Sequence, residues 1–207
     1  QSAAVVGGGN SISPPAKQYL IVVRHAKKLT NMKISCIGWG SLIWKPGKLN
    51  IENKWFEDGP LLPIEFTRQS DNGRMTLIID NAAKPVRTLW ALMTSENIHD
   101  AIKSLKEREG TSTANIHNIL KTDSTEDSIK LIVKNWLVTK DLDGAVWTGL
   151  SYRNGVRPSI EQVINQLLSL NHAIGQEAEE YIRKAPKQID TEYRRSIEKE
   201  LGWTAIE

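Results

Sequence analysis

The residues of this chain best suited to chemistry lie in a glycine-containing run, residues 36–44, which reads Cys-Ile-Gly-Trp-Gly-Ser-Leu-Ile-Trp. The apolar residues 34–37 predict a strand, and Gly38 and Gly40 predict a tight loop directly after it. Backbone N–H groups without a nearby Cβ approach a ligand closely, so such a loop can hold an anionic oxygen. Because Gly-x-Gly also occurs in ordinary sharp turns, the run alone is a weak signal.

Glu109 is the second candidate, at the end of a helix that we predict over residues 96–109. The apolar stripe of this helix comprises Ile98, Ala101, Ile102 and Leu105. Glu109 follows Leu105 by four positions, so its carboxylate lies on the same face. Burial and the negative end of the helix dipole both disfavour its charge, and we expect the raised pKa of a general acid/base. The alternative is a carboxylate in a frayed last turn, half in water and paired with Arg108 or a lysine.

The elements that must position these residues are predicted as strands in the first half of the chain and helices mostly in the second. Strands are expected at residues 34–37, 61–66, 75–79, 86–92, 129–138 and 145–150, with a hairpin turn at Asp71-Asn72-Gly73. A helix is expected at residues 96–109, with Thr94 or Ser95 as its N-cap and Gly110 as its stop signal. A second helix is expected to begin at a capping box formed by Ser159 and Gln162 and to extend through residue 170. Two more helices are expected at residues 177–184 and 190–201. Residues 111–128 are expected to form a surface loop, and the late helices to cover the core rather than bind a ligand.

Composition places few constraints on function. The 207 residues suffice for one domain, which we expect over residues 32–207. The single cysteine, Cys36, excludes an internal disulfide and a cysteine-based zinc cluster, and it suits a reducing compartment, so we expect a cytoplasmic protein. The four histidines do not cluster at ligand spacing, so no metal site is expected. No apolar run approaches the about 20 residues of a membrane span, so no membrane is expected.

The net charge of +3 comes from the N-terminal residues. Residues 1–31 contain four basic residues and no acidic one, which leaves 23 basic against 24 acidic residues in the remainder. We therefore expect no nucleic-acid partner. The segment 1–31 is compatible with a disordered extension, a transit segment or sequence upstream of the domain, and we favour the extension.

Taken together, residues 37–47 and the later Leu105-Lys106-Glu107-Arg108-Glu109-Gly110 resemble the γ-glutamylcyclotransferase-like superfamily. Its glutathione-degrading branch has a strand that ends in Gly-Tyr-Gly-Ser-Leu-Ile-Trp, and a catalytic glutamate in a Leu-x-x-x-Glu stretch at the end of a helix. The resemblance covers about residues 33–150. It implies an α+β fold with a small mixed β-barrel flanked by helices, to which this chain adds C-terminal helices at about 157–203.

The resemblance also implies an activity, the cyclisation of a small γ-glutamyl amine or peptide to 5-oxoproline without metal or cofactor. Glu109 would be the base and then the acid. The substrate would be bound by Gly38, Trp39, Gly40, Ser41 and Leu42. Arg68 is a further candidate, as a partner of the substrate carboxylate, and the alternative for it is an ordinary surface arginine. The backbone N–H groups of residues 40–42 would hold the substrate's α-carboxylate or the developing oxyanion.

Two departures keep a second function open. Trp39 stands where the family usually has tyrosine, and Gly110-Thr111-Ser112 replaces the Gly-Gly-Tyr of the glutathione-specific branch. The alternative is a binding or regulatory module that retains the fold without the chemistry. The substrate and the oligomeric state are not specified by these patterns.

Overall fold

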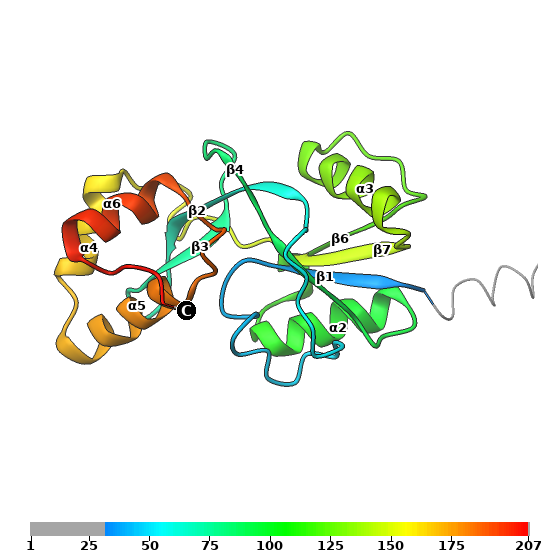
Figure 1. The fold of residues 1–207 in the computed structure, drawn as a ribbon, viewed down its shortest axis with the longest axis horizontal. Coiled ribbons are helices and arrows are strands. Elements are labelled where there is room, and N and C mark those ends of the chain that lie inside the picture. The colour runs from blue at the N-terminus through cyan, green and yellow to red at the C-terminus, as the bar shows by residue number, and fades with distance from the viewer. Residues whose placement is uncertain (1–31, 207) are drawn as a thin grey trace, which may run out of the picture.

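The computed structural model describes residues 32–206, which form a mixed α+β architecture with two sheets and five α-helices (Figure 1). The predicted α+β class is thus confirmed, whereas the segment 1–31 lies outside the described residues. The first sheet has the order β5-β1-β7-β6, with bounds β1 Ile34–Gly38, β5 Leu89–Leu92, β6 Ile116–Leu120 and β7 Gly144–Thr148. Strand β1 runs antiparallel to β5 and parallel to β7, and β6 runs antiparallel to β7.

The second sheet has the order β3-β2-β4, from β2 (Leu61–Gln69), β3 (Met75–Ile79) and β4 (Pro85–Arg87). The hairpin turn between β2 and β3 lies where Asn72-Gly73 predicts it, and Gly73 has the positive φ (91°) that such turns favour. The strand predicted over 86–92 is divided at Thr88 between the two sheets. The N–H and Oγ1 of this buried threonine both donate to the carbonyl oxygen of Pro60, which redirects the chain from β4 into β5.

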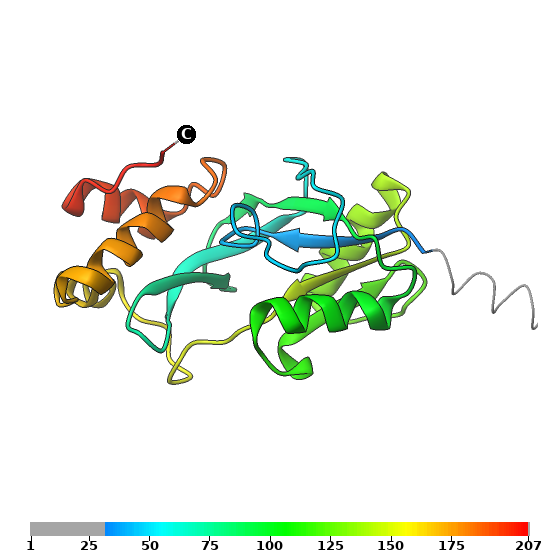
Figure 2. The same ribbon diagram turned by 90° about the horizontal axis from the view of Figure 1, so that it is seen from below.

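Helices α2 (Ile98–Glu109) and α3 (Ser128–Lys140) cover opposite faces of the first sheet (Figures 1 and 2). Alternate residues of the central strands divide between two buried clusters, as the period of a strand requires. The cluster on the α2 side includes Cys36, Val146, Ala101 and Leu105, and the cluster on the α3 side includes Ile37, Trp147, Val133 and Leu137. Helix α2 packs against β1 and β7. Its last turn lies near the C-terminal end of β1, where the glycine run begins (Figure 2).

Three predictions about these elements are wrong. Residues 129–138 form helix α3 rather than a strand, because Ile129, Val133 and Leu137 recur at helical spacing and pack on the sheet despite their β-branched neighbours. The expected loop 111–128 contains β6, an edge strand whose exposed side accommodates polar residues. The N-cap of α2 is Asn97 rather than Thr94 or Ser95, and its side chain accepts a hydrogen bond from the Asp100 N–H.

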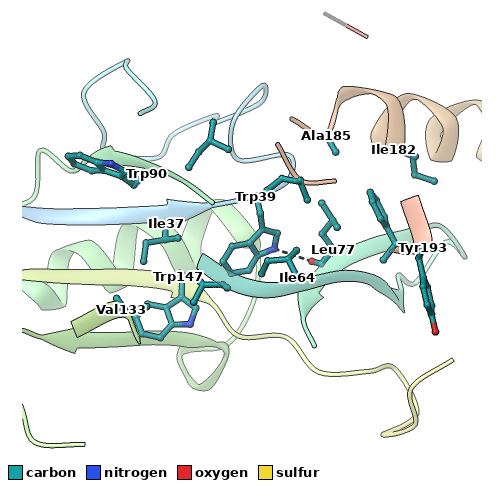
Figure 3. Packing of buried hydrophobic residues seen from close by; sticks show 14 of the residues in the cluster. Ile37, Trp39, Ile64, Leu77, Trp90, Val133, Trp147, Ile182, Ala185 and Tyr193 are labelled. Carbon is teal, nitrogen blue, oxygen red and sulfur yellow. Dashed lines mark hydrogen bonds between the residues drawn. The ribbon is translucent and has the colours of Figure 1, made fainter. Parts of the chain in front are cut away.

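The C-terminal helices α4 (Ile160–Leu168), α5 (His172–Lys184) and α6 (Glu192–Leu201) pack beside the second sheet (Figures 1 and 2). Their existence is as predicted, and only their ends differ from the predicted bounds. Buried Glu65 of β2 anchors α6, since it accepts hydrogen bonds from Thr191 Oγ1 and from the N–H of Tyr193 (3.2 Å). Burial nevertheless raises the pKa of the Glu65 carboxyl above its usual value. One continuous apolar cluster joins both sheets to these helices (Figure 3).

Replacing Ser159 with alanine is expected to lower the free energy of unfolding by about 1 kcal/mol. The predicted capping box is present: Ser159 Oγ accepts from the Gln162 N–H (3.3 Å), and the Gln162 side chain accepts from the Ser159 N–H (2.8 Å). Urea unfolding measures the loss. Ser169→Ala at the other end of α4 is the matched control, because within residues 32–206 the exposed Ser169 side chain bonds only the carbonyl oxygen of Gln166. Equal losses in the two variants would contradict the capping argument.

Candidate active site

A cavity of about 700 Å³ lies where the glycine run, the β2–β3 hairpin, the end of α2, the end of β7 and helix α5 meet. Six of the seven predicted site residues line it: Trp39, Gly40, Ser41, Leu42, Arg68 and Glu109. The structure thus brings together two segments that are almost 70 positions apart in the sequence. Gly38, the seventh, lies outside the lining of the cavity.

Gly38 has a packing role at the end of β1, where it pairs with Leu89. A Cβ at this position would lie 2.9 Å from the ring of Trp55, so no larger residue fits without movement of that ring. Trp39 is also turned inward: its indole N–H donates to the carbonyl oxygen of Leu77 (3.3 Å), which ties the glycine run to strand β3 (Figure 3). The polar atom of Trp39 is therefore engaged within the protein.

Residues 40–45 form one helix-like turn after β1. The carbonyl oxygen of Gly40 accepts from the Ile43 N–H (3.0 Å), and that of Ser41 accepts from the Lys45 N–H (2.9 Å). Within residues 32–206, the N–H groups of Gly40, Ser41 and Leu42 have no hydrogen-bond acceptor. These are the unsatisfied donors expected at the start of such a turn, and they belong to residues that line the cavity.

Arg108 connects the turn to Glu109. Its guanidinium donates to Glu109 Oε1, to Ser41 Oγ (3.1 Å) and to the carbonyl oxygen of Lys45 (2.7 Å). Both side chains of the ion pair are largely buried, with 12% of Arg108 and 16% of Glu109 exposed. The alternative stated for Glu109 is therefore correct in one part: the carboxylate pairs with Arg108. It is not correct in the other, because the carboxylate is largely buried rather than half in water. No partner for Glu109 Oε2 occurs in the described part of the chain.

Helix α2 ends at Glu109 because Gly110 adopts the left-handed conformation (φ 60°), as its predicted role as a stop signal requires. The apolar face that carries Ala101 and Leu105 is buried against the first sheet, and Glu109 continues this face to the cavity. Because Glu109 follows Leu105 by four positions, its carboxylate lies on the same face of the helix as Leu105, as predicted.

Arg68 projects from β2 into the same cavity, half-buried. Its guanidinium forms no ion pair or hydrogen bond with any residue in 32–206, whereas nearby Arg74 lies 3.6 Å from Glu177. A guanidinium that lines a cavity and has no carboxylate partner in the protein is suited to bind the carboxylate of a ligand.

Sequence reasoning missed several polar side chains of the cavity. The late helices are expected to cover the core; helix α5 does so, and its Glu177, Glu180 and Tyr181 also line the cavity. Tyr181 lies beside the sequence-distant residue Leu77, a contact that no local pattern reports. Thr148, at the end of β7, also lines the cavity, and its buried Oγ1 has no hydrogen-bond partner within residues 32–206.

No group of three or more histidine, cysteine, aspartate and glutamate side chains in residues 32–206 is arranged to hold a metal ion. Cys36 is buried, which raises the pKa of its thiol. None of the helices in the same part of the chain combines the length and the apolar character needed to cross a membrane.

No protein-family model, curated protein or solved structure matches this chain.

Proposed function

We propose that this protein is a γ-glutamylcyclotransferase-type enzyme, which cyclises a γ-glutamyl amine or peptide to 5-oxoproline and releases the amine. One observation supports the proposal: Glu109 and residues 40–42, whose amides are unsatisfied, line one cavity, and Arg108 links Glu109 to Ser41. The two sheets are, in this proposal, the parts of the small barrel that the resemblance implies, joined where β4 continues into β5.

The polar groups of the cavity are complementary to a γ-glutamyl compound, which carries an α-carboxylate, an α-ammonium group and a γ-amide. The Arg68 guanidinium is the expected partner of the α-carboxylate. Glu109 is the expected partner of the α-ammonium group, through its unpaired Oε2. The amides of residues 40–42 then face the γ-carbonyl oxygen, on which negative charge develops.

The reaction needs no external nucleophile, because the α-amine attacks the γ-carbonyl carbon within the same molecule. Glu109 takes a proton from the α-ammonium group, the C–N ring bond forms, and the carbonyl oxygen becomes an oxyanion. The ring nitrogen gives its second proton to water as the intermediate collapses, Glu109 protonates the leaving nitrogen, and the old C–N bond breaks. The released amine takes up a proton in water, so protons balance. Holding amine and carbonyl in contact accounts for much of the acceleration.

Incubation of the purified chain with glutathione, γ-glutamyl-alanine and γ-glutamyl-p-nitroanilide tests the proposal, with 5-oxoproline measured by mass spectrometry. Formation of 5-oxoproline from at least one compound, in proportion to enzyme, is the expected result. No product above the protein-free reaction with any γ-glutamyl compound would overturn it.

A second candidate function, a binding module without catalysis, is favoured by the Arg108–Glu109 ion pair. In this pair the carboxylate is already bound by a guanidinium, as in a structural ion pair. This alternative predicts saturable binding of γ-glutamyl compounds in calorimetry, with no 5-oxoproline formed.

Arg68→Met is expected to raise the KM for γ-glutamyl substrates about 30-fold and to change kcat less than about threefold, because a charged hydrogen bond made equally in the ground and transition states is lost. Steady-state kinetics measure both constants. Arg195→Met is the control, since exposed Arg195 pairs with Asp190 away from the cavity. An unchanged KM in Arg68→Met would remove Arg68 from the binding site.

A further inference from the structure

Helix α5 places the hydroxyl group of Tyr181 against the glycine run. The phenol oxygen accepts a hydrogen bond from the N–H of Leu77 (3.4 Å), on the edge strand β3. A Cβ built on Gly40 would lie only 2.7 Å from the same oxygen. The hydroxyl thus occupies space that exists because residue 40 is glycine, and it lies beside the turn with the unsatisfied amides.

The Tyr181 ring is held firmly, while its hydroxyl proton is left available. Trp44 and Phe66 contact the ring edge-to-face, with centroid distances of 5.5 and 6.4 Å. The oxygen already accepts from Leu77, and no acceptor for its own O–H occurs within residues 32–206. Burial, together with the charge of nearby Glu109, raises the pKa of Tyr181 to about 12. The group therefore remains a neutral donor at physiological pH.

We propose that Tyr181 donates a hydrogen bond to the oxyanion that forms on the γ-carbonyl oxygen, together with the amides of residues 40–42. The inference rests on the proposed function and extends it to the C-terminal helices, which then supply part of the active site. No proton is transferred in this role: the hydroxyl hydrogen stays on Tyr181 while the ring bond forms and the amide bond breaks.

Tyr181→Phe is expected to lower kcat about 100-fold, with KM changed less than about threefold, which is the lower end of the range seen when one donor to an oxyanion is removed. The loss should be equal for γ-glutamyl-alanine and γ-glutamyl-p-nitroanilide, because both form the same oxyanion. Wild-type kcat in Tyr181→Phe would overturn the inference while leaving the proposed function intact. A loss confined to the alanine compound would also overturn it, because that pattern indicates proton donation to the leaving amine.

Gly40→Ala provides an independent test. Its Cβ collides with the hydroxyl oxygen but would lie 3.6 Å, an ordinary contact, from the ring carbon that carries it. We therefore expect Gly40→Ala to lower kcat like Tyr181→Phe, and to cost less than about twofold when added to Tyr181→Phe. If the loss of kcat in the double variant equals the product of the losses in the two single variants, the inference is overturned. Urea midpoints of all three variants show whether they fold. Absence of 5-oxoproline with the wild-type protein would instead overturn the proposed function, and this inference with it.

Discussion

Replacing Glu109 with glutamine is expected to lower the rate of 5-oxoproline formation about 1,000-fold, within the range observed for loss of a general acid/base. Glutamine keeps the size of the side chain, and its amide oxygen can still accept the hydrogen bond that Arg108 donates to Oε1. It cannot accept a proton from the α-ammonium group. The measurement is kcat/KM with the γ-glutamyl compound that the wild-type protein turns over best.

Glu107→Gln is the matched control for this substitution, because exposed Glu107 lies on the same last turn of α2 and is not part of the cavity lining. We expect it to retain the wild-type rate. Circular dichroism and urea unfolding of both variants show whether the loss of the Glu109 charge, which leaves Arg108 without its ion-pair partner, disturbs the fold. A folded Glu109→Gln protein with wild-type kcat/KM would show that Glu109 is not the base.

Local patterns predicted much of what positions this site. The strand-to-turn transition at Gly38, the Asn72-Gly73 hairpin and the stop at Gly110 each depend on the conformational preferences of a few adjacent residues. The four-residue spacing from Leu105 predicted that Glu109 continues a buried face, and the structure places it at the cavity. These features are readable because their causes lie within one turn or one helix.

What could not be predicted depends on contacts between distant segments. The residues of α3 have β-branched side chains at several positions, and only packing on the first sheet decides for a helix. The hydrogen bond from Trp39 to Leu77, and that from Leu77 to Tyr181, join three segments that share no local motif. The sequence predicted Arg108 only as a possible ion-pair partner of Glu109. Its hydrogen bonds to Ser41 and Lys45 join segments that are distant in the sequence, so no local pattern predicts them.

The attachment of the C-terminal helices to the second sheet depends strongly on one buried carboxylate, Asp80, directly after β3. It accepts hydrogen bonds from Arg157 Nε (2.7 Å), the Tyr152 hydroxyl (2.8 Å) and the Ala82 N–H (3.0 Å). Arg157 in turn donates to the Tyr193 hydroxyl of α6 (2.6 Å). Asp80 thus connects the sheet, the segment before α4 and the start of α6, the framework on which α5 carries Tyr181.

Asp80→Asn is expected to lower the free energy of unfolding at pH 7 by about 2–3 kcal/mol, slightly less than for a fully buried ion pair because Arg157 is partly exposed. The amide keeps the shape of the side chain but lacks the charge that Arg157 requires. Asp71→Asn is the control: Asp71 also pairs with an arginine, Arg153, but is almost fully exposed, so a loss below about 1 kcal/mol is expected. Urea unfolding measures both.

The pH dependence of this loss identifies the charge as its cause. Burial alone would raise the pKa of Asp80, but the hydrogen bonds from Arg157, Tyr152 and Ala82 outweigh it and hold the pKa below the usual 3.8. The carboxylate therefore stabilises the fold above about pH 4, and this contribution is lost as the pH falls through the lowered pKa. The stability difference between the wild-type protein and Asp80→Asn should narrow from pH 7 to pH 3. An undiminished difference at pH 3 would mean that shape, rather than charge, holds the C-terminal helices to the sheet.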